Sequence, residues 1–246
     1  MDLTEIPGAD SFSRHPWEVV RARFFGEILR PLLGEAETML DAGAGDGWFA
    51  RRLAAQHPRL HVTCFDPGYE QRAERMLGEA ERVHYVSAPP PGPFDVVTLL
   101  DVLEHVPDDA ALLSSLTGVL RPGGYLLISV PAWPGLFSSH DAALGHQRRY
   151  RPREALALLR DASLDPLREG GLFHSLLLAR AASVALERAR PGPNGRAHEL
   201  KWRGGRVSAR AVQAILHADT RVSQLAVAAH LEIPGLSWWA LCQRPS

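Results

Sequence analysis

The sequence predicts an α/β protein with a doubly wound, mostly parallel β-sheet and helices on both of its faces. Short apolar runs of strand length alternate with patterns of helical period along most of the chain. A glycine-rich turn separates the first such run from the helix after it, at residues 39–50. Polar residues follow several of the apolar runs, where a parallel sheet would bring them to one edge.

Composition sets the first limits. The chain has 246 residues with a formal net charge of −1, so no basic surface indicates nucleic acid as a partner. This length suits one large α/β domain, and we expect residues 1–246 to form it. Cys64 and Cys242 each lie in an apolar run, which favours small core residues over a disulfide. We find no signal-peptide pattern and no run long enough to span a membrane, and expect a cytosolic protein.

The glycine turn has a spacing that distinguishes between cofactors. Gly43, Gly45 and Gly47 follow Asp41 on alternate positions. Glycine suits backbone with positive φ or close to a ligand, and the N–H groups at a helix start favour a polar or anionic group. A dinucleotide fingerprint needs its third glycine where Trp48 stands, so this spacing disfavours a nicotinamide cofactor.

The run D-x-G-x-G-x-G, with D-V-L-E-H-V from Asp101 and L-R-P-G-G from Leu120, resembles the class I S-adenosylmethionine-dependent methyltransferases. Within that class it is similar to the group that includes the ubiquinone and menaquinone methyltransferases, most firmly over residues 38–131. The resemblance implies S-adenosyl-L-methionine as cofactor and S-adenosyl-L-homocysteine as product. It also implies seven strands in the order 3-2-1-4-5-7-6, with the last strand antiparallel.

An amphipathic helix is predicted over residues 16–33, opened by Pro16. His15, Trp17 and Arg21 begin it. In methyltransferases that this chain resembles, such a segment forms a lid whose arginine meets the cofactor carboxylate, so residues 1–34 are assigned to a lid. The alternative is a docking helix with a solvated arginine.

The cofactor-binding core is expected over residues 35–131. A second strand over 60–65 ends at Asp66-Pro67, where an acidic side chain can accept hydrogen bonds from ribose hydroxyls. A turn aspartate before proline would give the same residue. The resemblance places the methionine half of the cofactor at Asp41, Gly43 and Gly45.

A helix over 69–80 and a third strand over 83–86 come next. Relatives often carry an acidic residue after this strand, reaching the adenine amino group, whereas this chain has Ser87-Ala88. The fourth strand, over 94–100, is a continuous apolar run and leads into Asp101-Val102, assigned to the donor site. A helix from Pro107, a turn over 121–124 and a fifth strand over 125–130 complete the core.

Residues 132–152 form a long loop rich in histidine, arginine and aromatic residues, expected at the same edge of the sheet. Methyl transfer mainly requires alignment of donor and acceptor, but an oxygen or amine acceptor also loses a proton. The candidates for catalysis are His146, His105, His140 and Tyr150, and Trp133 and Arg149 would line the acceptor pocket with them. Each histidine has a structural alternative. A metal site from His140, Asp141 and His146 is disfavoured because the acidic cluster of metal-dependent relatives is missing.

A sixth strand should begin near residue 164, and a last strand is expected over 235–242. Between them, residues 172–232 form a helical cap, where the choice of acceptor would be made. Part of this cap is apolar with basic flanks, which allows peripheral membrane contact, although lid or core packing is favoured.

The sequence thus predicts methyl transfer to a small or lipid-like acceptor, with oxygen ahead of nitrogen or carbon as the methylated atom. The chain would act as a monomer or a homodimer. Two alternatives remain: a protein that binds S-adenosylmethionine without turnover, and the disfavoured nicotinamide-dependent oxidoreductase.

Overall fold

The computed structural model describes residues 14–71, 81–189 and 205–246. Its described part contains a seven-stranded sheet with the order β3-β2-β1-β4-β5-β7-β6, which confirms the predicted order. The strands are β1 (Thr38–Ala42), β2 (His61–Phe65), β3 (Val83–Val86), β4 (Phe94–Leu100), β5 (Leu120–Pro131), β6 (Asp165–Leu172) and β7 (Ser237–Gln243). The first five strands pair in parallel, and β7 runs antiparallel to both β5 and β6.

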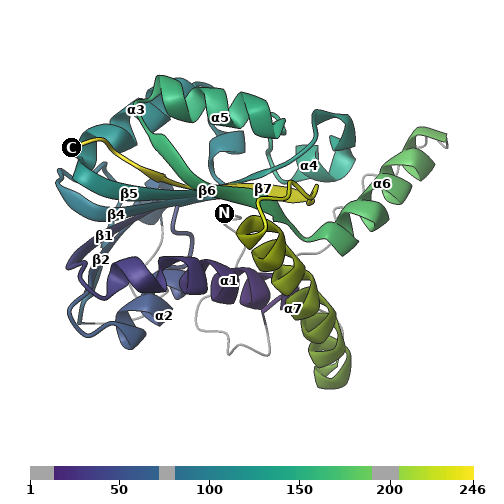
Figure 1. The fold of residues 1–246 in the computed structure, drawn as a ribbon, viewed down its shortest axis with the longest axis horizontal. Coiled ribbons are helices and arrows are strands. Elements are labelled where there is room, and N and C mark those ends of the chain that lie inside the picture. The colour runs from purple at the N-terminus through teal and green to yellow at the C-terminus, as the bar shows by residue number, and fades with distance from the viewer. Residues whose placement is uncertain (1–13, 72–80, 190–204) are drawn as a thin grey trace.

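Helices cover both faces of this sheet (Figure 1). The helices α1 (Pro16–Leu33), α2 (Trp48–Gln56) and α7 (Arg206–Ala228) lie on one face, and α3 (Asp109–Val119) and α5 (Pro152–Asp161) on the other. Because side chains alternate along a strand, β1 contributes to both layers: Met39 packs into one hydrophobic core and Leu40 into the other. The sheet is therefore buried on both sides, as its apolar strands predict.

The predicted N-terminal helix is present as α1. Pro16 lies in its first turn, where a missing N–H costs nothing, and the His15 side chain accepts a hydrogen bond from the backbone of Trp17. Phe24 and Trp239 meet edge to face with ring centroids 5.4 Å apart. The helix is thus fixed to the sheet by its buried face, and its N-terminal end lies near the glycine turn.

Two expectations need correction. The fifth strand begins at Leu120, not at residue 125, because Leu120 pairs with Phe94 before the register shifts to Val96 and Tyr125. The turn over residues 121–124 is therefore an irregularity within β5. The loop over 132–152 also contains regular structure, namely the 3₁₀ turn η4 (Pro134–Leu136) and the short helix α4 (Ser139–Ala143).

The helices α6 (His174–Ala189) and α7 extend beyond the end of the sheet that carries α4 (Figure 1). The Asp219 carboxylate on α7 accepts hydrogen bonds from the backbone N–H groups of His174 and Ser175, which connects the start of α6 to α7. Most of the predicted helix over 69–80 and part of the predicted cap over 172–232 fall outside the described residues. The structure shows η1 (Pro67–Gln71) before that gap. Among the helices described, none has the length and apolar character needed to cross a membrane.

Candidate functional site

The glycine turn after β1 has the backbone geometry that its sequence predicts. Gly43, Gly45 and Gly47 have φ angles of 71°, 60° and 71°, a region that favours glycine. Space is also limited, because a Cβ on Gly43 would lie 2.4 Å from Val102 Cγ2 and one on Gly47 would lie 2.5 Å from the Tyr85 ring. The turn therefore packs closely against β3 and against the segment that follows β4.

Asp66 lies at the end of β2 and faces this turn. Its Oδ2 accepts a hydrogen bond from the Gly45 N–H at 3.2 Å, and its Oδ1 accepts one from the Gly68 N–H at 2.8 Å. The side chain is buried. The Asp66 N–H donates to the Val86 carbonyl at 3.2 Å, so the predicted Ser87-Ala88 segment begins directly beside it. The structure thus brings together the groups predicted for the methionine, ribose and adenine parts of a cofactor.

Asp41, the last acidic residue before the turn, carries an unsatisfied oxygen. Its Oδ1 accepts a hydrogen bond from the Thr98 hydroxyl at 2.6 Å, while its Oδ2 has no partner among the described residues. The carboxyl is almost fully buried, and burial raises its pKa to about 6. A buried oxygen of this kind suits a donor supplied by a ligand, such as an ammonium group.

The start of α1 covers the glycine turn with two arginines. Arg14 pairs with Asp46 in the turn, and its guanidinium lies 4.6 Å from the centroid of the Trp48 ring. Arg21 pairs with Asp101 after β4 and stacks on the Trp17 ring at 4.5 Å. A small cavity remains between α1 and the start of α2, and its lining includes Arg14, Glu18, Arg21, Asp46 and Trp48.

These residues fit S-adenosylmethionine. The glycine backbone of the turn passes where no Cβ could be accommodated at Gly43 or Gly47, the Asp41 Oδ2 atom lacks a donor among the described residues, and Arg21 lines the cavity beside the turn. A guanidinium suits a carboxylate in paired geometry. The predicted role of Arg21 therefore requires a change of partner, because Asp101 holds its guanidinium in the structure.

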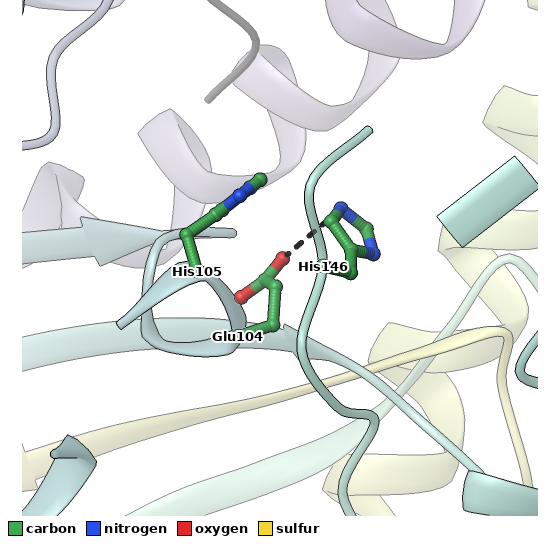
Figure 2. A group of neighbouring side chains, drawn as sticks. All are labelled: Glu104, His105 and His146. Atoms are coloured by element: carbon green, nitrogen blue, oxygen red, sulfur yellow. Dashed lines mark ion pairs between the residues drawn. The ribbon is translucent and has the colours of Figure 1, made fainter. Parts of the chain in front are cut away.

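A second group of polar side chains lies beyond the end of β4, beside residues 132–152, the loop predicted to hold the acceptor (the acceptor loop). Figure 2 shows the Glu104 carboxyl beside the rings of His105 and His146. Glu104 Oε1 lies 3.9 Å from His146 Nε2, and the two histidine rings meet edge to face with centroids 4.8 Å apart. Ligand atoms of these three residues lie within 4.8 Å of one another, a spacing that a cation could bridge.

Charge and burial differ across this group. Burial raises the pKa of the fully buried Glu104 carboxyl to about 7, and neither of its oxygens has a hydrogen-bond partner among the described residues. Burial lowers the pKa of His105 to about 4, so its ring is neutral near pH 7. The Gln147 N–H donates to the Glu104 carbonyl at 2.8 Å and holds the acceptor loop against η3 (Leu103–His105).

Asp141, at the start of α4, fixes the ring of His146. Its Oδ1 lies 3.2 Å from His146 Nδ1 and accepts hydrogen bonds from Arg149, and its Oδ2 accepts from Arg180 on α6. Hydrogen bonds and charge from His146 and the two arginines outweigh burial and hold the pKa of Asp141 well below its ordinary value. Asp141 is therefore an ionised anchor for His146.

The other predicted acceptor residues are not members of this group of three. The Tyr150 hydroxyl lies 3.0 Å from Asp109 Oδ2, to which it can donate, and burial raises its pKa. The Trp133 Nε1 atom donates to the Gly235 carbonyl at 2.8 Å. Arg149 is buried against Asp141, and His140 belongs to α4 outside the group of three. Their predicted roles toward an acceptor remain predictions.

Glu104 and Arg180 are absent from the predicted site. Glu104 stands in the D-V-L-E-H run, so a signal was present, but the sequence does not show that its carboxyl would be buried without a partner. Arg180 is far from Asp141 in the sequence and meets it only because α6 folds back toward α4 (Figure 1). No local pattern indicates that contact.

A family profile described as a methyltransferase domain matches residues 13–169. A ubiquinone biosynthesis O-methyltransferase of Xylella fastidiosa (strain 9a5c) is 34% identical over 101 residues, which is 37% of this chain and 40% of that protein. Alignments with this relative and two further curated relatives span 40 to 62% of those proteins' length.

Solved structures show the same fold. The N-methyltransferase NodS of Bradyrhizobium japonicum WM9, solved with S-adenosyl-L-homocysteine, has a TM-score of 0.56 at 14% identity, covering 100% of this chain and 95% of NodS. The [4+2]-cyclase SpnF has a TM-score of 0.54 at 18% identity, covering 98% of this chain and 86% of SpnF.

The sheet order and the glycine turn define a class I S-adenosylmethionine-dependent methyltransferase fold. The match over residues 13–169 shows that the chain belongs to the methyltransferase-domain family. S-adenosyl-L-methionine is accordingly its cofactor, as the sequence resemblance implies.

Proposed function

We propose that this protein transfers the methyl group of S-adenosylmethionine to a small or lipid-like acceptor through a hydroxyl oxygen, with an amine nitrogen or a carbon as the alternative atom. The observation that carries the proposal is the position of two polar groups at the carboxyl end of the sheet. Asp66 faces Gly45 on the donor side, and Glu104, His105 and His146 lie together on the acceptor side. The X. fastidiosa relative is named an O-methyltransferase, and this name is the reason for placing oxygen first.

The cofactor, when bound, supplies an electrophilic methyl group on a sulfonium. The chain has two tasks: to hold both reactants in line and to exclude water. Asp41, Asp66 and the glycine turn would hold the donor, with Arg21 released from Asp101 to meet its carboxylate. Residues of the acceptor loop would position the acceptor, and the anchored His146 or its neighbour Glu104 would take the proton that a hydroxyl or amine loses.

Isothermal titration calorimetry tests the donor site. We expect wild-type protein to bind S-adenosylhomocysteine and not NAD, and Asp66→Ala to lose high-affinity binding. Asp95→Ala is a suitable control, because Asp95 also caps backbone N–H groups but lies at the start of β4, away from the glycine turn. Wild-type affinity in the Asp66 variant would remove the ribose assignment. Stronger binding of NAD than of S-adenosylhomocysteine would reject the proposed class of reaction.

A second candidate function is cofactor binding without methyl transfer. The observation that favours it is the likeness in fold to SpnF, because SpnF is named a cyclase and not a methyltransferase. The two candidates differ in turnover. Incubation with S-adenosylmethionine labelled in its methyl group and a panel of phenols, amines and quinols should transfer label to an acceptor if the first proposal is right. Tight binding with no transfer to any member of the panel would favour the second.

A further inference from the structure

Glu104 is a buried acid that its own chain leaves unsatisfied. Its side chain is fully buried, yet neither carboxyl oxygen has a hydrogen-bond partner among the described residues. The nearest polar atom in an ion pair is His146 Nε2, which lies 3.9 Å from Oε1 and is beyond hydrogen-bond distance. Burial of a carboxyl without hydrogen-bond donors costs free energy. We therefore expect a donor from outside the chain to bind at this position.

The neighbouring rings cannot simply turn to satisfy it. Asp141 holds His146 through Nδ1, which leaves Nε2 on the Glu104 side of the ring. His105 stacks edge to face on His146 and is neutral near pH 7. The Gln147 N–H fixes the loop on the Glu104 carbonyl. Glu104 therefore remains a buried acid without a hydrogen-bond partner among the described residues, beside two histidine rings (Figure 2).

Glu104 lies in the fold next to both the predicted donor site and the predicted acceptor site. Glu104 follows β4 three residues after Asp101, which pairs with Arg21 of the lid helix, and His146 belongs to the acceptor loop. Ligands of open α/β sheets bind at these carboxyl ends. Glu104 thus lies between the segment that closes the donor site and the segment predicted to hold the acceptor.

We propose that Glu104, with His146 beside it, forms the subsite for the proton-bearing atom of the acceptor, a hydroxyl or an amine, and receives that proton. The proposal rests on the proposed function. In the step, the acceptor's O–H or N–H bond breaks, the proton bonds to a Glu104 oxygen, and the electron pair stays on the acceptor atom to form its bond with the transferred methyl. The sulfur–methyl bond breaks at the same time, and S-adenosylhomocysteine would leave with that bond's electron pair. Glu104 ends as a neutral carboxylic acid and later returns the proton to water.

The charges around Glu104 are consistent with this role. Burial favours the protonated acid, while Arg21 from α1 and Arg149 before α5 favour the carboxylate. His146 from the acceptor loop and His105 from η3 face the same carboxyl. Burial outweighs the two arginines and raises the pKa of Glu104 to about 7, where an acid can both take and return a proton in neutral solution.

The first test needs no turnover. In protein labelled with ¹³C at the glutamate carboxyls, we expect one signal to titrate near neutral pH and to be missing from Glu104→Gln. Glu154→Gln is the matched control, since Glu154 is exposed on α5 and its pKa is lowered by Arg151. The neutral-pH signal should persist in that variant. Its presence in Glu104→Gln as well would overturn the assignment.

The second test asks whether the acid faces a ligand. Phenol, catechol and benzylamine are added as probes to wild-type protein saturated with S-adenosylhomocysteine. We expect at least one of them to shift the Glu104 signal and to bind Glu104→Gln at least tenfold more weakly. If none of the three moves that signal, the subsite is wrong. A Zn²⁺ ion that survives dialysis and abolishes the titration would also overturn the proposal, because the group would then be a metal centre.

Calorimetry with S-adenosylhomocysteine separates this inference from the proposed function. Glu104→Gln should bind it with wild-type affinity, because the glutamine keeps the size of the side chain and lies outside the glycine turn. Failure of the wild-type protein to bind it would reject the proposed function while the titration of Glu104 still stood.

Discussion

The side chain of Val102 lies directly against the backbone of Gly43, so that a Cβ added to Gly43 would come within 2.4 Å of Val102 Cγ2. Two segments that are distant in sequence, the turn after β1 and the segment after β4, therefore form one surface. The first carries the predicted donor contacts. The second leads within two residues to Glu104, so any change at this contact should affect both halves of the site.

Gly43→Ala is expected to destabilise the protein and to weaken binding of S-adenosylhomocysteine. The residue has a φ of 71°, which costs an L-residue about 1–2 kcal/mol, and the contact with Val102 adds to this. Gly118→Ala should have the opposite effect, because Gly118 is exposed near the end of α3 with nothing within 4 Å of its added Cβ. There alanine should raise the free energy of unfolding by roughly 0.5–1 kcal/mol. Urea denaturation measures both, and equal effects would contradict the turn geometry.

Arg21→Met should weaken S-adenosylhomocysteine binding by about 10- to 100-fold, the range expected when a charge-assisted hydrogen bond is lost. Arg23→Met is the matched control on the same helix, because Arg23 is exposed and pairs only with Glu27 among the ion pairs described. Its dissociation constant should stay within twofold of the wild type. If calorimetry finds the two variants alike, Arg21 holds helix α1 in place through Trp17 and Asp101 and does not contact the cofactor.

Asp141→Asn should destabilise the protein more than Arg180→Ala. The aspartate variant leaves Arg149 and Arg180 together without their shared carboxylate, and breaking a buried pair in this way costs about 3–5 kcal/mol. Arg180→Ala leaves the Asp141–Arg149 pair in place. Arg188→Ala is the control for loss of contact between α6 and the acceptor loop, because Arg188 donates only to the Gly135 carbonyl among the hydrogen bonds described. Thermal unfolding should show the largest loss of stability in Asp141→Asn, a smaller loss in Arg180→Ala and the smallest in Arg188→Ala. A reversed order would mean that α6, not Asp141, supports the loop.

The regular parts of this fold could be predicted from sequence because their causes are local. The apolar run over 94–100 and the glycine spacing after Asp41 each determine a strand or a turn without distant contacts, and the strand order followed from the resemblance. The fifth strand was misplaced because pairing of Leu120 with Phe94 depends on the neighbouring strand. The sequence also does not show that the Tyr150 hydroxyl would lie within hydrogen-bond distance of Asp109 or that its ring would be buried, and its role toward an acceptor remains a prediction. The burial of Glu104 depends on segments that meet only in the folded chain.

The burial of Glu104 also makes the stability of the folded protein depend on pH. Comparison of Glu104→Gln with wild type separates this contribution from those of other groups. The pKa of Glu104 is about 7 in the folded protein and near 4.5 when unfolded, so the folded state keeps the proton to higher pH. Stability from this group is therefore greatest below about pH 4.5 and falls as the pH rises toward 7. Glu104→Gln lacks this fall, whereas the pH dependence from Asp41, which has the same sign, is common to both proteins.

The difference in unfolding free energy between Glu104→Gln and wild type should consequently grow in favour of the variant between pH 4.5 and pH 8. One pKa unit corresponds to 1.36 kcal/mol, which sets an upper limit of about 3 kcal/mol on the change. Urea denaturation at five or six pH values measures it, with Glu154→Gln expected to stay within a few tenths of a kcal/mol of wild type. A variant more stable than wild type at pH 8 yet impaired in turnover would show that the buried acid is kept for chemistry and not for folding. Parallel stability curves for Glu104→Gln and wild type would instead mean that the carboxyl finds a partner in solution, and the argument for a ligand at Glu104 would lose its basis.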